Sequence, residues 1–244
     1  QRERLWFHVD GACGALGMMS DRLKPRYVGI ERADSLALDF HKWAQVPYDA
    51  GFVLVRDRRL HQETFASPAA YLSRAERGMA AGSPWPCDFG PDLSRNFKAL
   101  KVWFTLQVYG TQRLGQMMDG TCQLARYLEQ RIATEPELEL LAPVSLNIVC
   151  FRYRGLQNSS AKATAECQNN APATSSPRAV PDPAAHAMGE LNQLNSELVI
   201  AIQESGIAAP SSTLINGQVA VRAALFNHRT TQCEVDALFD ATLK

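Results

Sequence analysis

The feature that most constrains this chain is an apolar stretch that ends in a cluster of polar and aromatic side chains. Residues 35–39 (SLALD) favour a strand, and residues 40–43 (FHKW) follow it directly. Lys42 therefore stands beside a histidine and between aromatic rings, where a solvated cation is unusual. Burial would lower the pKa of this lysine and make it a nucleophile able to form a Schiff base. A surface lysine in a loop is the alternative, because lysines are rarely buried.

A second apolar stretch, residues 5–10 (LWFHVD), predicts a buried strand that ends in Asp10, with Ala12 two residues later. In enzymes that use pyridoxal 5′-phosphate (PLP), a carboxylate keeps the pyridine nitrogen protonated and a lysine carries the aldehyde as an imine. An acid at the end of one strand and a lysine after the next suit this chemistry. The glycines of residues 11–17 lack the spacing of a dinucleotide-binding loop, so we expect a close-packed turn there.

Three short stretches together resemble one enzyme family. Residues 8–12 (HVDGA), 33–35 (ADS) and 41–43 (HKW) are similar to the group II PLP-dependent amino-acid decarboxylases, which act on aromatic amino acids, histidine, glutamate and cysteine sulfinate. The resemblance implies PLP as cofactor and decarboxylation of an L-amino acid to its amine and carbon dioxide, through a Schiff base on Lys42. It places Asp10 at the pyridine nitrogen, Ala12 against the cofactor ring and His41 at the cofactor phosphate. A packed core histidine is the alternative for His41.

A long stretch, residues 66–91, is interrupted by prolines and glycines and shows little apolar periodicity. A loop of this length inside a compact domain is usually functional. Tyr71 and Leu72 resemble a pair on the mobile catalytic loop of these decarboxylases, in which the phenol protonates the substrate carbon. Relatives with phenylalanine there tend towards oxidative deamination to an aldehyde, so Tyr71 favours plain decarboxylation. An aromatic side chain that anchors a turn is the alternative.

Two arginines are candidates for contacts with the substrate. Arg95 opens a predicted helix over residues 93–104 and resembles a family arginine near the active-site entrance. Arg222 falls in a predicted hairpin, where its planar fork suits a carboxylate. A solvated helix-start arginine and a structural ion pair are the respective alternatives.

The resemblance implies an α/β chain with the architecture of the PLP-dependent transferases (aspartate-aminotransferase, fold type I). It covers the second half of the large domain, residues 1–134, and a small α+β domain, residues 135–244, with a low-complexity insertion at 157–187. Further expected strands are 51–56, 138–141, 146–153, 213–215 and 218–226, and further helices are 58–65, 112–134, 188–205 and 230–243. We expect residues 51–56 to be buried on both faces, and Asn216-Gly217 to form the hairpin turn.

Because only the second half of the family is resembled, we expect a fragment, a split-gene subunit or a processed half. The missing part includes the loop that holds the cofactor phosphate and the histidine that stacks on the ring. The chain is then expected to form a homodimer or to assemble with an N-terminal-half chain. A PLP-dependent carbon–carbon lyase, an aldehyde-forming enzyme and a non-catalytic half remain alternatives, and the amino-acid substrate stays open.

Composition narrows the choice of partners. The chain has 25 basic and 25 acidic residues and a formal net charge of zero, which argues against nucleic acid and against a membrane surface. No apolar run is long enough to span a bilayer. The six cysteines form no Cys-x-x-Cys pair, so we expect reduced thiols in the cytoplasm and no metal site.

Overall fold

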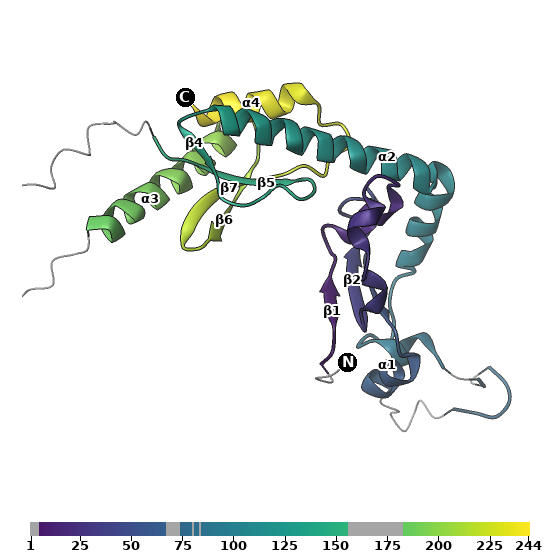
Figure 1. The fold of residues 1–244 in the computed structure, drawn as a ribbon. Coiled ribbons are helices and arrows are strands. Elements are labelled where there is room, and N and C mark those ends of the chain that lie inside the picture. Colours follow the sequence, from purple (N-terminus) through teal and green to yellow (C-terminus); the bar gives the residue numbers. More distant parts are fainter. Residues whose placement is uncertain (1–4, 67–73, 80, 83, 156–182) are drawn as a thin grey trace, which may run out of the picture. The chain divides into compact units, whose positions relative to one another are not determined.

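The computed structural model describes residues 5–66, 74–79, 81–82, 84–155 and 183–244, and the side chains of the last range from residue 186 onward (Figure 1). Its residues fall into two compact units, Gln1–Asp119 and Gly120–Lys244. This division runs within one long helix, earlier in the chain than the boundary at 134/135 that we expected from the sequence. Both units combine helices with a β-sheet.

The first unit contains a three-stranded sheet of β1 (His8–Asp10), β2 (Ser35–Asp39) and β3 (Gly51–Val55), in the order β1-β2-β3. Strands β1 and β2 are parallel, and Asp10 pairs with Ala37. Strands β2 and β3 are antiparallel, and Asp39 pairs with Gly51. The bounds predicted for β2 are confirmed, since its apolar residues end where the polar cluster begins.

Burial of β1 and β3 differs from the prediction. The side chains of Phe52, Val53 and Leu54 are 46–49% exposed, and His8 and Asp10 are also exposed. The prediction that these strands are buried was wrong, because the described residues leave the faces of these two edge strands largely uncovered. Only the central strand β2 contributes an apolar side chain to the core, Leu38, which is 6% exposed.

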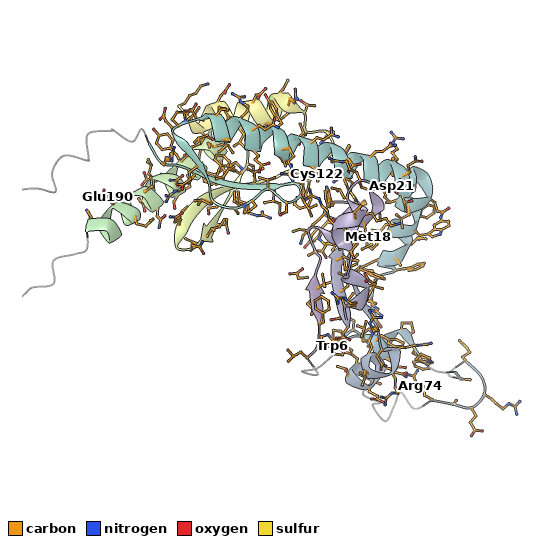
Figure 2. The ribbon with its side chains drawn as sticks, in the orientation of Figure 1. Trp6, Met18, Asp21, Arg74, Cys122 and Glu190 are labelled. Carbon is orange, nitrogen blue, oxygen red and sulfur yellow. The ribbon has the colours of Figure 1, made fainter. Side chains whose placement is uncertain are left out.

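Ser35 at the start of β2 links the two parallel strands through its side chain. Its hydroxyl accepts a hydrogen bond from Nε1 of Trp6 at 2.7 Å and lies 2.7 Å from Nδ1 of His8. Trp6 comes from the segment that leads into β1 (Figure 2). Since Ser35 is buried, these contacts satisfy a polar group that would otherwise be costly to remove from water.

The connection from β1 to β2 is made of three short 3₁₀ helices, η1 (Ala15–Met19), η2 (Lys24–Tyr27) and η3 (Ile30–Arg32). Its glycines allow close approach of neighbouring segments. A Cβ atom at Gly11 would lie 2.9 Å from the carbonyl oxygen of Ala37, and one at Gly17 would lie 2.2 Å from the Tyr27 hydroxyl. The expectation of a close-packed turn is confirmed, because no side chain fits at either position.

Two helices follow the first sheet in the chain. Helix α1 (Arg58–Phe65) begins after Asp57, whose carboxylate accepts the free N–H groups of Arg59 and Leu60. Helix α2 (Lys98–Thr134) contains both predicted helices as two segments that meet at a kink, and it starts five residues later than expected, so Arg95 precedes it. A break in helical geometry at Gly110, with φ +72° and ψ 157°, explains why the sequence pattern changes there.

The second unit contains a four-stranded antiparallel sheet in the order β4-β5-β7-β6, flanked by two further helices. Its elements are β4 (Leu138–Leu140), β5 (Ile148–Tyr153), α3 (Pro183–Glu204), β6 (Ser211–Ile215), β7 (Gln218–Ala224) and α4 (Gln232–Thr242). Asn216 and Gly217 both have positive φ, at 51° and 77°, and they join β6 to β7. The predicted hairpin is therefore confirmed.

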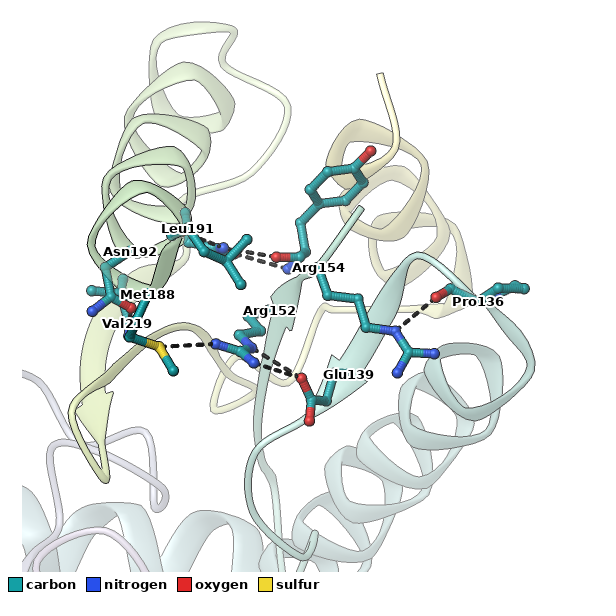
Figure 3. A network of polar contacts seen from close by, with 10 residues as sticks. Pro136, Glu139, Arg152, Arg154, Met188, Leu191, Asn192 and Val219 are labelled. Carbon is teal, nitrogen blue, oxygen red and sulfur yellow. Dashed lines mark hydrogen bonds and ion pairs between the residues drawn. The ribbon is translucent and has the colours of Figure 1, made fainter. Parts of the chain in front are cut away.

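Helix α3 is attached to the sheet of this unit by apolar packing and by buried polar contacts. Asn195, which is fully buried, accepts from the N–H of Tyr153 and donates to its carbonyl, both at 2.8 Å. Figure 3 shows the neighbouring network, in which Arg152 donates twice to Glu139 and approaches the sulfur of Met188. The core beneath is formed by buried aliphatic and aromatic side chains, among them Leu128, Ile132, Val149, Phe151, Val199, Val221 and Val235.

Within the described ranges, no helix combines the length and the apolar character needed to cross a bilayer. Among these same residues, no group of three or more histidine, cysteine, aspartate or glutamate side chains is arranged to hold a metal ion.

Candidate active site

Asp10 and Lys42 lie at the same edge of the first sheet. Strands β1 and β2 are parallel, so their carboxyl ends meet at one edge, with Asp10 ending β1 and Lys42 three residues beyond β2. The two side chains are close enough for the charge of Asp10 to raise the pKa of Lys42. The structure therefore brings together the acid and the amine that the sequence singled out.

The turn that carries Lys42 is fixed by its buried neighbours. Trp43 and Ala44 are no more than 1% exposed and Val46 is 3% exposed. The N–H of Phe40 donates to the carbonyl of Ala50 at 3.0 Å, and the N–H of Val46 donates to that of Phe40 at 3.1 Å. These contacts hold the backbone on both sides of Lys42, so its side chain is presented from a rigid support.

Lys42 pairs with Asp39, the last residue of β2. The distance from Lys42 Nζ to Asp39 Oδ2 is 2.7 Å, and the two side chains are 36% and 21% exposed. This hydrogen bond is the main cause that raises the pKa of Lys42 above its ordinary value, and it outweighs the opposing effect of burial. Our expectation of a lowered pKa was wrong, because it considered burial and ignored the acid three residues before the lysine.

Among Asp39, His41 and Lys42, the side chain of His41 is the most buried, with 12% exposed. Its Nδ1 accepts a hydrogen bond from the N–H of Ala50 at 3.0 Å, and its ring packs edge-on against Tyr48, with centroids 4.5 Å apart. A neutral His41 therefore carries its proton on Nε2, which lies 3.8 Å from Asp39 Oδ2. This nitrogen can donate a hydrogen bond to an anionic group.

Asp10 and Ala12 form the start of the turn after β1. The N–H of Ala12 donates to Asp10 Oδ1 at 3.1 Å, which orients the carboxylate. Asp10 is exposed and Ala12 is partly buried. Asp10 Oδ2 accepts no hydrogen bond from the residues that the structure describes, so it is available to a donor from outside the chain.

The other candidates from the sequence are Tyr71, Arg95 and Arg222. Tyr71 lies outside the described residues. Arg95 is exposed, and its Nη2 donates to the carbonyl of Pro86 at 2.9 Å. Arg222 belongs to β7 of the second unit, where its Nη1 lies 3.4 Å from the Ser211 hydroxyl. Each arginine is therefore described with its own local partner, and its role toward the substrate remains a prediction.

Within the stretch predicted to be the catalytic loop, Arg74 contacts two residues from the later part of that stretch. The guanidinium carbon of Arg74 lies 3.9 Å from the ring centroid of Trp85, and Arg74 forms an ion pair with Asp88, whose side chain is 9% exposed. Asp88 also accepts the N–H of Trp85 at 2.8 Å within helix η5 (Pro86–Phe89). These contacts join Arg74 to the segment of residues 85–88.

Two acids at this site were missed in the sequence. Asp39 is the direct partner of Lys42, and its position three residues earlier was the available signal. Asp49 forms an ion pair with Lys98 at 2.6 Å, and this hydrogen bond lowers the pKa of Asp49. No local pattern could reveal that pair, because it joins residues from distant parts of the sequence. It links the start of α2 to the loop that supplies the His41 hydrogen bond.

Comparison with known proteins identifies the family of the chain. The family described as "Pyridoxal-dependent decarboxylase conserved domain" matches residues 1–154. Aromatic-L-amino-acid decarboxylase of Bacillus atrophaeus is 32% identical over 233 residues, which cover 96% of this chain and 43% of that protein. Histidine decarboxylase of Drosophila melanogaster is 36% identical over 152 residues, which cover 62% of this chain and 18% of that protein. The chain thus spans less than half the length of these relatives.

Solved structures agree on the fold. Oryza sativa TDC, solved with PLP and tryptamine, matches with a TM-score of 0.75 at 21% identity, over 99% of this chain and 45% of that one. Mouse CSAD matches with a TM-score of 0.75 at 23% identity, over the whole chain and 46% of that one. The predicted fold type I architecture, in its partial form, is confirmed. The chain belongs to the pyridoxal-dependent decarboxylase family.

Proposed function

We propose that this chain contributes the lysine-bearing part of a PLP-dependent enzyme that decarboxylates an L-amino acid to the amine and carbon dioxide. One observation carries the proposal: the family match covers the sheet edge at which Lys42 and Asp10 lie together. The relatives named above support the reaction class, and none of them fixes the amino acid.

The residues at this edge fit PLP in their chemistry. Lys42 supplies a primary amine for covalent attachment, and Oδ2 of Asp10 is available to accept from a protonated pyridine nitrogen. Ala12 offers a small surface for a flat ring, and Nε2 of His41 offers a hydrogen-bond donor for a phosphate. When bound, PLP supplies an electron sink for the electron pair that remains on the substrate carbon after carbon dioxide leaves.

The protein groups have separate tasks in this proposal. Asp10 keeps a proton on the pyridine nitrogen, and the Ala12 N–H holds its carboxylate in place. Tyr71 returns a proton to the substrate carbon, a role that rests on the resemblance of its loop. Arg95 and Arg222 are the candidates for binding the substrate carboxylate, because an arginine fork suits that group.

A partner is also part of the proposal. Apolar side chains are exposed on β3 and before β1, including Phe52, Val53, Leu54, Leu5 and Phe7. Large exposed apolar side chains on a sheet favour a binding partner that covers them. We propose that a second copy, or a chain equivalent to the unmatched part of the relatives, covers these side chains and completes the substrate pocket. We also propose a cytoplasmic location, because the spacing of the cysteines in the sequence predicts reduced thiols.

The direct test is release of carbon dioxide from a panel of aromatic, acidic and small L-amino acids in the presence of PLP. We expect activity in the assembled protein and its loss in Lys42→Ala, while Lys24→Ala, a change at an exposed lysine, should retain it. Full activity in Lys42→Ala would exclude the proposed role of Lys42.

A non-catalytic half that stabilises a partner chain is the second candidate. The exposed apolar side chains of β3 favour it, since they call for a partner whether or not Lys42 reacts. A stable complex that binds no PLP and releases no carbon dioxide from any amino acid of the panel would favour this candidate over the enzyme.

A further inference from the structure

The carboxylate of Asp39 lies against both basic side chains of the turn after β2. Its Oδ2 is 2.7 Å from Nζ of Lys42 and 3.8 Å from Nε2 of His41. Its Oδ1 faces Gly51, the paired residue on β3, where a Cβ atom would lie only 3.3 Å away. Because glycine has no side chain, position 51 leaves space for this carboxylate.

We propose that Asp39 is a positioning residue that holds the Lys42 ammonium at the end of β2, so that Lys42 reacts with a carbonyl compound only after this ion pair has given up a proton. That the carbonyl compound is PLP rests on the proposed function. Attack on a carbonyl carbon needs the lone pair of a neutral amine. The N–H bond of the ammonium therefore breaks first, and its proton passes to water or hydroxide.

The groups that face Lys42 come from both parallel strands. Asp39 ends β2, Asp10 ends β1, and Cys13 lies in the turn after β1; each of them raises the pKa of Lys42, with the Asp39 hydrogen bond as the largest cause. Burial acts in the opposite direction. His41 contacts Asp39, with Nε2 at 3.8 Å from Oδ2, and the Asp39 carboxylate is the group with the largest effect on Lys42.

Competitive acetylation tests this role without any cofactor. The purified chain is treated with acetic anhydride over a range of pH, and acetylated Lys42 is quantified by peptide mass spectrometry, with Lys24 as the internal reference. In Asp39→Asn we expect the pH of half-maximal labelling of Lys42 to fall by about one unit, the size of effect of a neighbouring opposite charge. Asp10→Asn removes a more distant charge and should cause a smaller fall.

Two further variants show whether a change in labelling comes from the Asp39 charge or from a folding defect. Gly51→Ala keeps every charge and crowds Oδ1 of Asp39, so it should also lower the half-labelling pH, by less than Asp39→Asn does. Asp39→Glu keeps the charge and should retain most of the wild-type value. An unchanged half-labelling pH for Lys42 in folded Asp39→Asn would overturn the proposal, as would equal falls in Asp39→Asn and Asp10→Asn.

Trapping with PLP separates this inference from the proposed function. After borohydride reduction, Asp39→Asn should accumulate a pyridoxyl adduct at a lower pH than the wild type. If the labelling shift is found and the wild type forms no adduct, the role of Asp39 stands and the proposed function fails. If the adduct forms and labelling does not shift, the inference about Asp39 fails alone.

Discussion

Lys42 combines a buried support with a charged partner, and this combination decides its behaviour. The neighbouring Trp43 and Ala44 are buried, whereas the side chain of Lys42 itself is 36% exposed and bonded to Asp39. In a partly exposed site, a carboxylate at 2.7 Å influences the amine more than desolvation does. The lysine is therefore held as a cation until a change in pH or a bound molecule alters the pair.

Tyr71 is the residue whose substitution should change the product. If its phenol protonates the substrate carbon, Tyr71→Phe removes the proton donor, and dissolved dioxygen can then oxidise that carbon, which gives the aldehyde with release of ammonia and hydrogen peroxide. We expect the ratio of amine to aldehyde to fall in that variant, measured by chromatography of the products from one accepted amino acid. An unchanged amine yield in Tyr71→Phe would remove Tyr71 from the mechanism.

At the candidate site, the sequence revealed some of the individual residues but not the contacts between their side chains. Asp10 and Lys42 were recognised because each follows an apolar strand, and a parallel pairing of these strands brings them to one edge. The raised pKa of Lys42 was not foreseen, because it depends on a side-chain contact with Asp39. The ion pair between Asp49 and Lys98 joins distant segments, so only the folded chain shows it.

Helix α2 packs against the connection between β1 and β2 at a glycine. A Cβ atom at Gly115 would lie 2.4 Å from the carbonyl oxygen of Met19 and 2.8 Å from its carbonyl carbon. Both neighbours are backbone atoms, so they cannot move aside as a flexible side chain can. This close approach positions the turn that begins after Asp10.

Substitution of this glycine should be costly. We expect Gly115→Ala to lower the free energy of unfolding by about 1–3 kcal/mol, the usual cost of overpacking, measured by urea denaturation. Gly120→Ala is the matched control in the same helix, since a Cβ atom there meets nothing within 4 Å. It should be neutral or stabilising by up to about 1 kcal/mol, because alanine favours a helix. Equal effects of the two changes would contradict the packing described here.

The elements themselves were largely predictable, and their burial was not. Strand β2 and helix α1 have the expected bounds, because apolar runs and the capping Asp57 mark their ends locally. The exposure of Phe52 and Val53 depends on which strands lie at the edges of the sheet and on what covers its faces. Those are properties of the whole assembly, which apolar composition alone does not reveal.

Both units contain acids whose pKa is lowered by hydrogen bonds within the same unit. Asp49 is bonded by Lys98 in the first unit, and Asp236 is bonded by Tyr127 and Arg131 in the second. Glu234 forms the capping box of α4 with Thr231, which lowers its pKa as well. Because the folded pKa lies below the unfolded one, each group favours the folded state at neutral pH and loses this contribution in acid.

We therefore expect the stability of the chain to fall as the pH drops below about 4, where such carboxylates take up protons. The measurement is the midpoint of thermal unfolding as a function of pH, followed by circular dichroism. Asp236→Asn should reduce the acid dependence and lower the midpoint at neutral pH. A midpoint that is constant from pH 7 down to pH 3 would contradict this account of the ion pairs.

The central claim is that Lys42 is the residue to which PLP becomes attached. It is tested most directly by incubation of the protein with PLP, reduction with borohydride, and denaturing intact-mass and peptide mass spectrometry. We predict a single pyridoxyl phosphate adduct that maps to Lys42 and is absent from Lys42→Ala. A wild-type protein that carries no adduct, or carries it on another lysine such as Lys98, would contradict the claim.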